Sequence, residues 1–272
     1  ERIFETMDEP VTVKDAKDAV EMPKIRGEVT FDHVNFSYDA SKQILNDVSF
    51  TVKPGESVAL VGPTGAGKST IVNLISRFYN VNGGRVLIDG QDISQVTIHS
   101  LREQMGIMMQ DSFIFSGDIE DNIRYGKLDA THEEIVKASR TVCADEFISK
   151  MPDRYQTEVR ERGSMLSQGQ KQLISFARTL LSDPAILILD EATSSIDVQT
   201  EKALQTGLNA MLKGRTSFII AHRLSTIKSA DWILVMNQGN VLEQGTHDSL
   251  MEQNGFYANL YQSQFADSEK AE

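Results

Sequence analysis

Apolar and polar residues alternate in the part of the chain that follows Gly27. The alternating apolar positions are Val29, Phe31, Val34, Phe36, Tyr38, Phe50 and Val52. A period of two is typical of strands that bury one face and expose the other. Pro54-Gly55 then predicts a turn. The pattern therefore predicts half-buried strands before residue 54.

Three shorter stretches are apolar without alternation: Val58–Val61, Ala185–Leu189 and Phe218–Ala221. Continuous apolar runs of this length are typical of strands buried on both faces, as in a parallel sheet covered by helices. Each run ends at a polar cluster. Since ligands bind at the carboxyl ends of strands in open α/β sheets, we expect three separate stretches of chain to meet at one site.

Residues 116–182 are predicted to be mostly helical, with helices over Thr131–Ser149 and Gln170–Leu181. Four apolar residues share one face of the second helix: Leu173, Ala177, Leu180 and Leu181. The tail Asp248–Gln264 predicts a weaker helix. Residues 1–26 carry many charges and two prolines, which predicts a linker.

The first buried strand leads into Gly62-Pro-Thr-Gly-Ala-Gly-Lys-Ser69, which fits the P-loop pattern G-x-x-x-x-G-K-[ST]. A helix is predicted over Thr70–Tyr79, so the motif has the strand–loop–helix context that it requires. Gly65 and Gly67 allow backbone conformations that a side chain would forbid. The loop N–H groups and the start of the helix would then face a phosphate.

Side chains at the two strand ends complete a site for ATP and Mg²⁺. Lys68 brings a positive charge to the outer phosphates, and the Ser69 hydroxyl suits Mg²⁺, which prefers oxygen ligands. Asp190 ends the second apolar run, which is the usual Walker B arrangement for holding Mg²⁺. Glu191 follows it and can polarise an attacking water.

Composition limits the classes of partner. The 272 residues carry a formal net charge of −12, which argues against a nucleic-acid partner because such proteins need a basic face. No apolar run approaches the roughly eighteen residues that a membrane span requires. The single Cys143 is expected to be a small buried residue. The histidines without a site context are expected on the surface: His33, His99, His132 and His247.

Several further motifs distinguish one family within the superfamily of P-loop NTPases. Leu166-Ser-Gln-Gly-Gln170 resembles the signature of ATP-binding cassette proteins, whose usual form is Leu-Ser-Gly-Gly-Gln. Gln110 resembles the Q-loop glutamine, Ser194–Asp197 the D-loop and His222 the switch histidine. Tyr38 resembles the aromatic residue of the A-loop. The order and spacing are those of the family, so the chain is similar to the nucleotide-binding domain of an ATP-binding cassette (ABC) transporter.

The resemblance covers about residues 27–262 and implies a set of site residues. The implied ATP contacts are Tyr38, Gly62, Thr64, Gly65, Ala66, Gly67, Lys68, Ser69, Thr70, Gln110, Ser167, Gly169, Gln170 and Asp197. The implied Mg²⁺ ligands are Ser69, Gln110 and Asp190. The implied catalytic residues are Lys68, Glu191 and His222. A core tyrosine is the alternative for Tyr38, and the Ser167 segment taken alone favours an ordinary helix N-cap with a glycine turn.

Two segments resemble exporters in particular. Thr157-Glu-Val-Arg-Glu-Arg-Gly163 resembles the X-loop, although Arg160 stands where glycine is common. Glu1–Asp8 resembles the segment that follows the last transmembrane helix. These likenesses imply a transmembrane domain in the same polypeptide and a position on the cytoplasmic face of the cell membrane.

Gln168 departs from the family signature. Glycine is usual at this position, and a side chain adds bulk where a phosphate is expected to approach the backbone. The family resemblance implies that two domains meet head-to-tail, so that each ATP lies between one P-loop and the other signature. The intact Lys68, Glu191 and His222 then suggest one half of a heterodimeric multidrug-type exporter with one degenerate site. A tolerated substitution in a homodimeric exporter is the alternative.

The expected fold is α/β: a RecA-like P-loop NTPase core with an antiparallel β subdomain and a helical insertion. The expected parts are a linker (1–26), the core with the β subdomain (27–115), the helical subdomain (116–182), the continued core (183–247) and a helical tail (248–272). The expected function is ATP hydrolysis that drives export. A nucleotide-gated partner that does not hydrolyse ATP, an importer subunit and an ABC-type ATPase outside transport are the alternatives.

Overall fold

A computed structural model of the chain describes residues 11–39, 41–109, 113–160, 163–190, 198–221 and 223–265. Within these ranges a six-stranded sheet forms the centre, in the order β12–β11–β3–β10–β9–β6. Its strands are β3 (Ser57–Val61), β6 (Met105–Met108), β9 (Ile186–Asp190), β10 (Thr216–Ile220), β11 (Trp232–Asn237) and β12 (Asn240–Gly245). Neighbouring strands are parallel except for the pair β11–β12. The three apolar runs are thus confirmed as buried parallel strands.

A second, antiparallel sheet has the order β2–β1–β4–β5. Its strands are β1 (Val29–Phe36), β2 (Leu45–Val52), β4 (Gly83–Ile88) and β5 (Gln91–Asp92). The alternating residues predicted to face a core do so in β1 and β2, where Val29, Phe31 and Phe50 are buried. A bulge interrupts the pairing of β1 between Phe31 and Val34. A short pair, β7 (Gly117–Asp118) and β8 (Glu158–Val159), lies outside both sheets.

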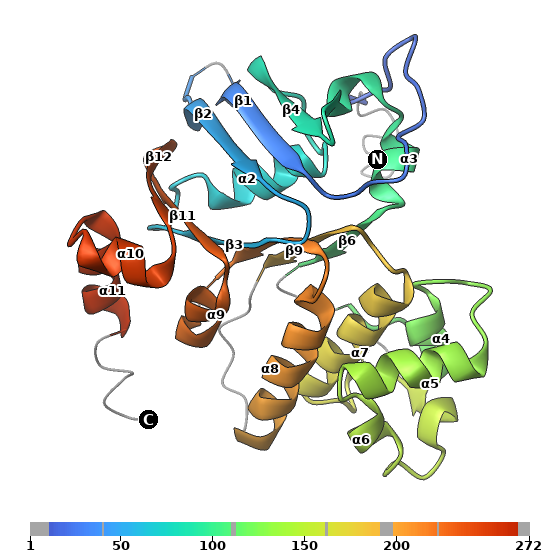
Figure 1. The fold of residues 1–272 in the computed structure, drawn as a ribbon. Coiled ribbons are helices and arrows are strands. Elements are labelled where there is room, and N and C mark those ends of the chain that lie inside the picture. The colour runs from blue at the N-terminus through green and yellow to red at the C-terminus, as the bar shows by residue number, and fades with distance from the viewer. Residues whose placement is uncertain are drawn as a thin grey trace.

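Alternate residues of each central strand point to opposite faces of the six-stranded sheet. Val58 and Leu60 of β3 pack with α2 (Lys68–Ile75) and the antiparallel sheet. Ala59 and Val61 pack with helices on the other face, as Figure 1 shows. The helices of that face are α4 (Ile119–Arg124), α5 (His132–Thr141), α7 (Gln168–Leu181), α8 (Val198–Leu212) and α9 (Leu224–Ser229). The P-loop helix and the helical subdomain therefore lie on opposite sides of the sheet.

The remaining elements connect these layers. They are η1 (Ile93–Gln95), α3 (Ile98–Arg102), α6 (Asp145–Ile148), η2 (Arg154–Gln156), α10 (His247–Glu252) and α11 (Phe256–Phe265). The tail predicted as one weak helix is therefore two, α10 and α11. Within the described part of the chain, every helix is too short or too polar to cross a bilayer.

The prediction of one helix over Thr131–Ser149 is wrong. Helix α5 ends at Thr141 and α6 begins at Asp145, because Cys143 takes a left-handed conformation with φ 63°. The Ala144 N–H donates to the Ser139 carbonyl at 2.8 Å, which closes a Schellman-type turn. Cys143 is consequently half-buried and not fully buried as expected.

The segment predicted as a linker packs against the domain over its described part. Val20 forms a β-bridge with Val96, and Met22 and Ile25 are buried in the same core as the antiparallel sheet. The many charges and two prolines of residues 1–26 predict a linker. Its described residues instead form part of the folded domain.

Candidate nucleotide-binding site

A glycine-rich loop joins the buried strand β3 to helix α2. The helix begins at Lys68, and its N-cap is Gly67, which has φ 107° and offers no side chain to the first N–H groups of the helix. The Ala66 N–H donates to the Pro63 carbonyl at 3.1 Å, which curls the loop on itself. Helix N–H groups left without a side-chain partner favour an anion at this end of the helix.

The glycines of the loop differ in what surrounds them. A Cβ on Gly62 would lie 2.1 Å from the Met236 carbonyl oxygen, and one on Gly67 would lie 2.8 Å from Leu45. At Gly65, where φ is 80°, a Cβ would meet nothing within 4 Å. The loop is therefore tied to the core at both ends and is open at its middle. That shape fits a phosphate chain seated on the loop backbone.

Lys68 extends from the start of α2 back over this loop. Its Nζ donates to the carbonyls of Gly62 at 2.7 Å and Pro63 at 3.0 Å. Burial lowers the pKa of Lys68 from its ordinary value, and the negative charge of Asp190 opposes that shift. The Lys68 amine and the Asp190 carboxylate therefore influence each other electrostatically.

The carboxyl ends of four parallel strands of the central sheet lie side by side. In β10, Ile220 pairs with Leu60 of β3 on one side and with Asp190 of β9 on the other. In β6, Met108 pairs with Leu189, one residue before Asp190. The P-loop and Asp190 therefore reach the same edge of the sheet.

Four predicted site residues lie outside the described residues: Gln110, Glu191, Asp197 and His222. Their described neighbours Met109, Asp190 and Ala221 directly follow or end strands of the central sheet. The roles assigned to these four side chains consequently stay predictions.

Among the described residues, two of the predicted Mg²⁺ ligands lie at this edge of the sheet. Ser69 is exposed next to the P-loop, and Asp190 is half-buried at the strand end. Among the described residues no group of three or more His, Cys, Asp or Glu side chains could hold a metal ion. Mg²⁺ commonly takes one or two protein oxygens and completes its shell with phosphates and water. The donor set therefore fits Mg²⁺ delivered together with a nucleotide.

Tyr38 lies beside the first turn of the P-loop helix. Its hydroxyl is 3.1 Å from Thr70 Oγ1 and accepts a hydrogen bond from Asn73 Nδ2 at 3.3 Å. Edge-to-face contacts with Phe36 and Tyr79 fix the ring, with centroids 4.8 and 4.9 Å away. The side chain nevertheless remains 46% exposed, which rules out the alternative of a core tyrosine. An exposed, oriented ring next to the phosphate loop suits stacking on adenine.

The signature segment does not join the P-loop within one chain. Ser167 is the N-cap of α7 and accepts from the Gln170 N–H at 3.2 Å, while Gln170 Oε1 accepts from the Ser167 N–H at 3.0 Å. These bonds form an ordinary capping box. Gly169 is buried, and Gln168 is the first residue of the helix. Helix α7 packs on the sheet face opposite α2, so the helix that follows the signature and the P-loop helix lie on different sides of the sheet.

An aromatic cluster was missed by the sequence analysis. Phe113 and Tyr125 are 55% and 61% exposed, and Phe115 contacts both rings. The Arg178 guanidinium lies 5.3 Å from the Phe115 ring centroid and donates to the Phe113 carbonyl at 3.0 Å. These residues come from separate loops and helices, so no sequence period connects them. Burial lowers the pKa of Arg178 from its ordinary value.

Three of the histidines expected on the surface have a side-chain hydrogen-bond partner. The Nδ1 atoms of His33 and His132 each lie 2.7 Å from a carboxylate oxygen, of Asp47 and Glu120 respectively, and His247 Nδ1 lies 2.8 Å from the Tyr257 hydroxyl. His247 is half-buried, because α10 packs against α11 at this point. None of the three belongs to the strand ends that carry the P-loop and Asp190, so none changes the candidate site.

The fold and the loop together define a P-loop nucleotide-binding domain. Residues 45–194 match the ABC transporter family. The chain is 54% identical over 98% of its length to the ABC transporter ATP-binding protein YknV of Bacillus subtilis and covers 44% of that protein. It is 47% identical over 94% of its length to a fatty acid ABC transporter ATP-binding/permease protein of Mycobacterium bovis and covers 40% of it.

A solved structure agrees with these matches. It is a bacterial Atm1-family ABC exporter with ATP bound, 45% identical with a TM-score of 0.89, and the alignment covers 97% of this chain and 46% of that one. The chain belongs to the ABC transporter family and is an ATP-binding domain similar to those of exporters. It spans less than half the length of the relatives it matches.

Proposed function

We propose that this chain binds ATP with Mg²⁺ and hydrolyses ATP as the motor domain of a membrane exporter. The observation that supports this proposal most directly is that Lys68, the open glycine loop and Asp190 lie at one edge of the central sheet. The exposed Tyr38 adds a surface for the base on the adjoining helix turn. ATP binding itself follows from membership of the family.

Each residue of the site has a separate task in this proposal. The loop N–H groups and Lys68 hold the β- and γ-phosphates, and they stabilise charge that develops during phosphoryl transfer. Ser69, Asp190 and Gln110 would hold Mg²⁺, which neutralises phosphate charge. Glu191 orients and deprotonates the attacking water, and His222 donates a hydrogen bond to the γ-phosphate.

A second nucleotide-binding domain completes the site. Ser167 and the N–H groups that follow it begin a helix on the sheet face opposite the P-loop, so this chain cannot close its own site with them. A head-to-tail dimer would bring the signature of one domain to the P-loop of the other. Because Gln168 weakens the signature of this chain, we propose that the partner is a different chain with a regular one.

The membrane domain is the other partner. The curated relatives include ATP-binding/permease proteins of which this chain covers 40%. The exposed cluster Phe113, Phe115 and Tyr125 is an apolar patch of the type that marks protein–protein contacts. We propose that it contacts the membrane domain of the same polypeptide at the cytoplasmic face of the cell membrane.

Two substitutions separate binding from chemistry. In Lys68→Ala we expect the dissociation constant for MgATP to rise by about 10- to 100-fold, as for a lost charge-assisted contact. In Glu191→Gln we expect unchanged ATP affinity and a fall of about 100-fold or more in single-turnover hydrolysis. The exposed Lys53→Ala and Glu252→Gln serve as matched controls.

The outcomes distinguish the possible functions. An unchanged dissociation constant in Lys68→Ala would contradict the phosphate site. Unchanged turnover in Glu191→Gln would remove its role as the base. ATP binding without turnover in the wild-type dimer would instead support a nucleotide-gated structural partner.

A further inference from the structure

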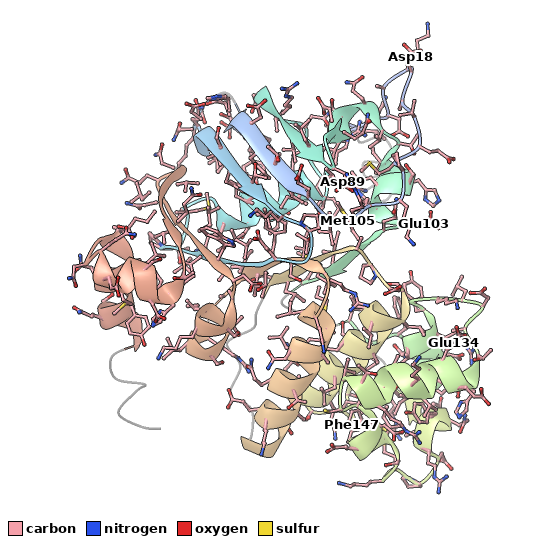
Figure 2. The ribbon with its side chains drawn as sticks, viewed as in Figure 1. Asp18, Asp89, Glu103, Met105, Glu134 and Phe147 are labelled. Atoms are coloured by element: carbon pink, nitrogen blue, oxygen red, sulfur yellow. The ribbon has the colours of Figure 1, made fainter. Side chains whose placement is uncertain are left out.

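Residues 14–28, here called the N-terminal strap, run along one side of the domain before β1. Figure 2 shows Asp18 on the outer bend of this segment and Asp89 near its other end. Near the end of the strap, the Gly27 carbonyl accepts a hydrogen bond from the buried Thr216 Oγ1 at 2.7 Å. A Cβ on Gly27 would lie 2.3 Å from that same oxygen, so the strap enters the core closely packed.

Hydrogen bonds attach the strap to the start of α3 and to the residue before it. The Thr97 N–H donates to the Val20 carbonyl at 2.8 Å. The Met22 N–H donates to Ser100 Oγ at 2.7 Å. Helix α3 leads directly into β6, whose carboxyl end adjoins Asp190. The strap is therefore joined to a strand that forms part of the nucleotide edge.

Two side chains hold the second half of the strap. Gln104 Oε1 accepts from the Ile25 N–H at 2.8 Å, and its Nε2 donates to the Pro23 carbonyl at 3.1 Å. The Asp89 carboxylate accepts from the N–H groups of residues 26, 27 and 28 at 2.6, 3.2 and 2.9 Å. A carboxylate that receives several N–H groups binds its segment firmly.

Arg77 joins the strap to the P-loop helix. It is the residue that follows the C-cap of α2, and its side chain is 2% exposed. The guanidinium donates from Nη2 to the Lys14 carbonyl at 3.1 Å and from Nη1 to the Val96 carbonyl, and Nη1 lies 3.8 Å from the Asp15 carboxylate. Most partners of this buried guanidinium therefore lie in the strap and in the turn that contains Val96.

The backbone of Arg77 indicates that the side chain matters at this position. Its φ is 51°, and the Phe78 N–H donates to the Asn73 carbonyl at 2.9 Å, which closes a Schellman-type turn. Glycine adopts this left-handed conformation without cost, whereas arginine does not. The contacts that the guanidinium makes with the strap offset that cost.

We propose that Arg77 is a positioning residue that couples the attachment of the N-terminal strap to the geometry of the P-loop. The proposal rests on the proposed ATP site. If the strap detaches, the buried guanidinium loses the Lys14 carbonyl and the Asp15 carboxylate, and the end of α2 must move to solvate it. Helix α2 is about 12 Å long at 1.5 Å per residue. Five of its residues are buried, so a shift at Arg77 displaces Lys68.

The coupling between strap attachment and ATP binding is reciprocal, so it can be measured from the strap. If attachment of the strap favours ATP binding, ATP must favour attachment of the strap by the same factor. Amide hydrogen exchange reports attachment, because the N–H groups of Val20, Met22 and Ile25 are bonded only while the strap is in place. We expect saturating MgATP to slow exchange of these amides by about tenfold in the wild-type 272-residue chain.

Two variants test the coupling from opposite sides. Arg77→Met keeps the apolar stem but removes the donors, and Gln104→Leu removes the side-chain contacts to Pro23 and Ile25 without altering α2. In both we expect fast strap exchange that no longer depends on ATP, together with a dissociation constant for MgATP raised about tenfold. Arg85→Met is the control, since it removes an exposed arginine of β4 that pairs with Asp32 of β1. Gln104→Leu keeps the test valid if Arg77→Met does not fold.

The contrary outcomes are distinct. A strap that exchanges fast in either variant while ATP affinity stays within about twofold of wild type overturns the coupling. Strap exchange in the wild-type chain that saturating ATP leaves unchanged overturns it as well. A wild-type chain that fails to bind ATP overturns the proposed function together with this inference.

Discussion

At the scale of the residue, substitution of Tyr38 distinguishes the contribution of the adenine base to ATP affinity from that of the phosphates. Its ring is fixed by Phe36, Tyr79 and two hydroxyl hydrogen bonds, yet almost half of it is exposed. In Tyr38→Ala we expect the dissociation constant for ATP to rise by about 5- to 150-fold, since stacking on an aromatic ring contributes about 1–3 kcal/mol per base. Affinity for inorganic tripolyphosphate should stay unchanged, because it has no base.

Calorimetric titration of both ligands provides the measurement. Tyr125→Ala is the matched control, because Tyr125 is also an exposed tyrosine but lies in the aromatic cluster at α4. Equal losses of ATP and tripolyphosphate affinity in Tyr38→Ala would show that the substitution disturbs α2 and not a base platform.

The P-loop could be predicted from residue types alone, because its glycines stand where the local backbone leaves no room for a side chain. Gly62 and Gly67 are glycine since any side chain would collide with Met236 or Leu45. The aromatic cluster was not predictable. Phe113, Tyr125 and Arg178 meet only after α4 and α7 pack together, and their spacing along the chain carries no period.

At the scale of the element, the buried strands were the most predictable part of the fold. A continuous apolar run in a strand is shielded from water only when both faces of the strand are buried. Strands β3, β9 and β10 are buried in this way. The end of α5 was not predictable, because Cys143 occupies the left-handed position where glycine is the usual signal. The sequence predicts a linker for the N-terminal strap and gives no sign that it packs on the domain. Its contacts depend on Arg77, Asp89 and Gln104, which are distant in sequence.

The C-terminal helix α11 begins on a carboxylate supplied by β12. Glu243 accepts from the N–H groups of Phe256 at 2.5 Å and Tyr257 at 2.9 Å. A Cβ on Gly255 would lie 2.1 Å from Glu243 Oε1, so glycine permits this approach. A negative charge at a helix N-terminus stabilises the helix by about 0.3–1 kcal/mol beyond the hydrogen bonds it accepts.

We therefore expect Glu243→Gln to destabilise α11 by about 1–2 kcal/mol. Amide exchange of residues 258–262 should accelerate, while exchange in β3 and β10 stays unchanged. The exposed Glu252→Gln is the control. If the loss is the same at high salt as at low salt, the charge of Glu243 contributes nothing and only its hydrogen bonds matter.

At the scale of the whole molecule, the central sheet lies between the P-loop helix and the helix that follows the signature segment. Helix α2 packs on one face, and α7 with Ser167 at its start packs on the other (Figure 1). Under the proposed head-to-tail arrangement, donors from a second molecule complete the phosphate site of this chain. The same proposal makes Gln168, which departs from the family pattern, the residue that decides which second molecule fits.

Gln168 gives the last prediction, which tests whether this chain pairs with itself. In the Glu191→Gln background, which should retain ATP, we expect the chain to stay monomeric with MgATP, because Gln168 adds bulk where the partner's phosphate approaches the backbone. Replacing Gln168 by glycine should permit an ATP-dependent homodimer, measured by light scattering coupled to size-exclusion chromatography. Gln168→Ala is the control, since alanine shortens the side chain but keeps a Cβ on the first residue of α7. If the chain with Gln168 already dimerises with ATP and hydrolyses it cooperatively when Glu191 is intact, the heterodimer proposal fails and a homodimeric exporter replaces it.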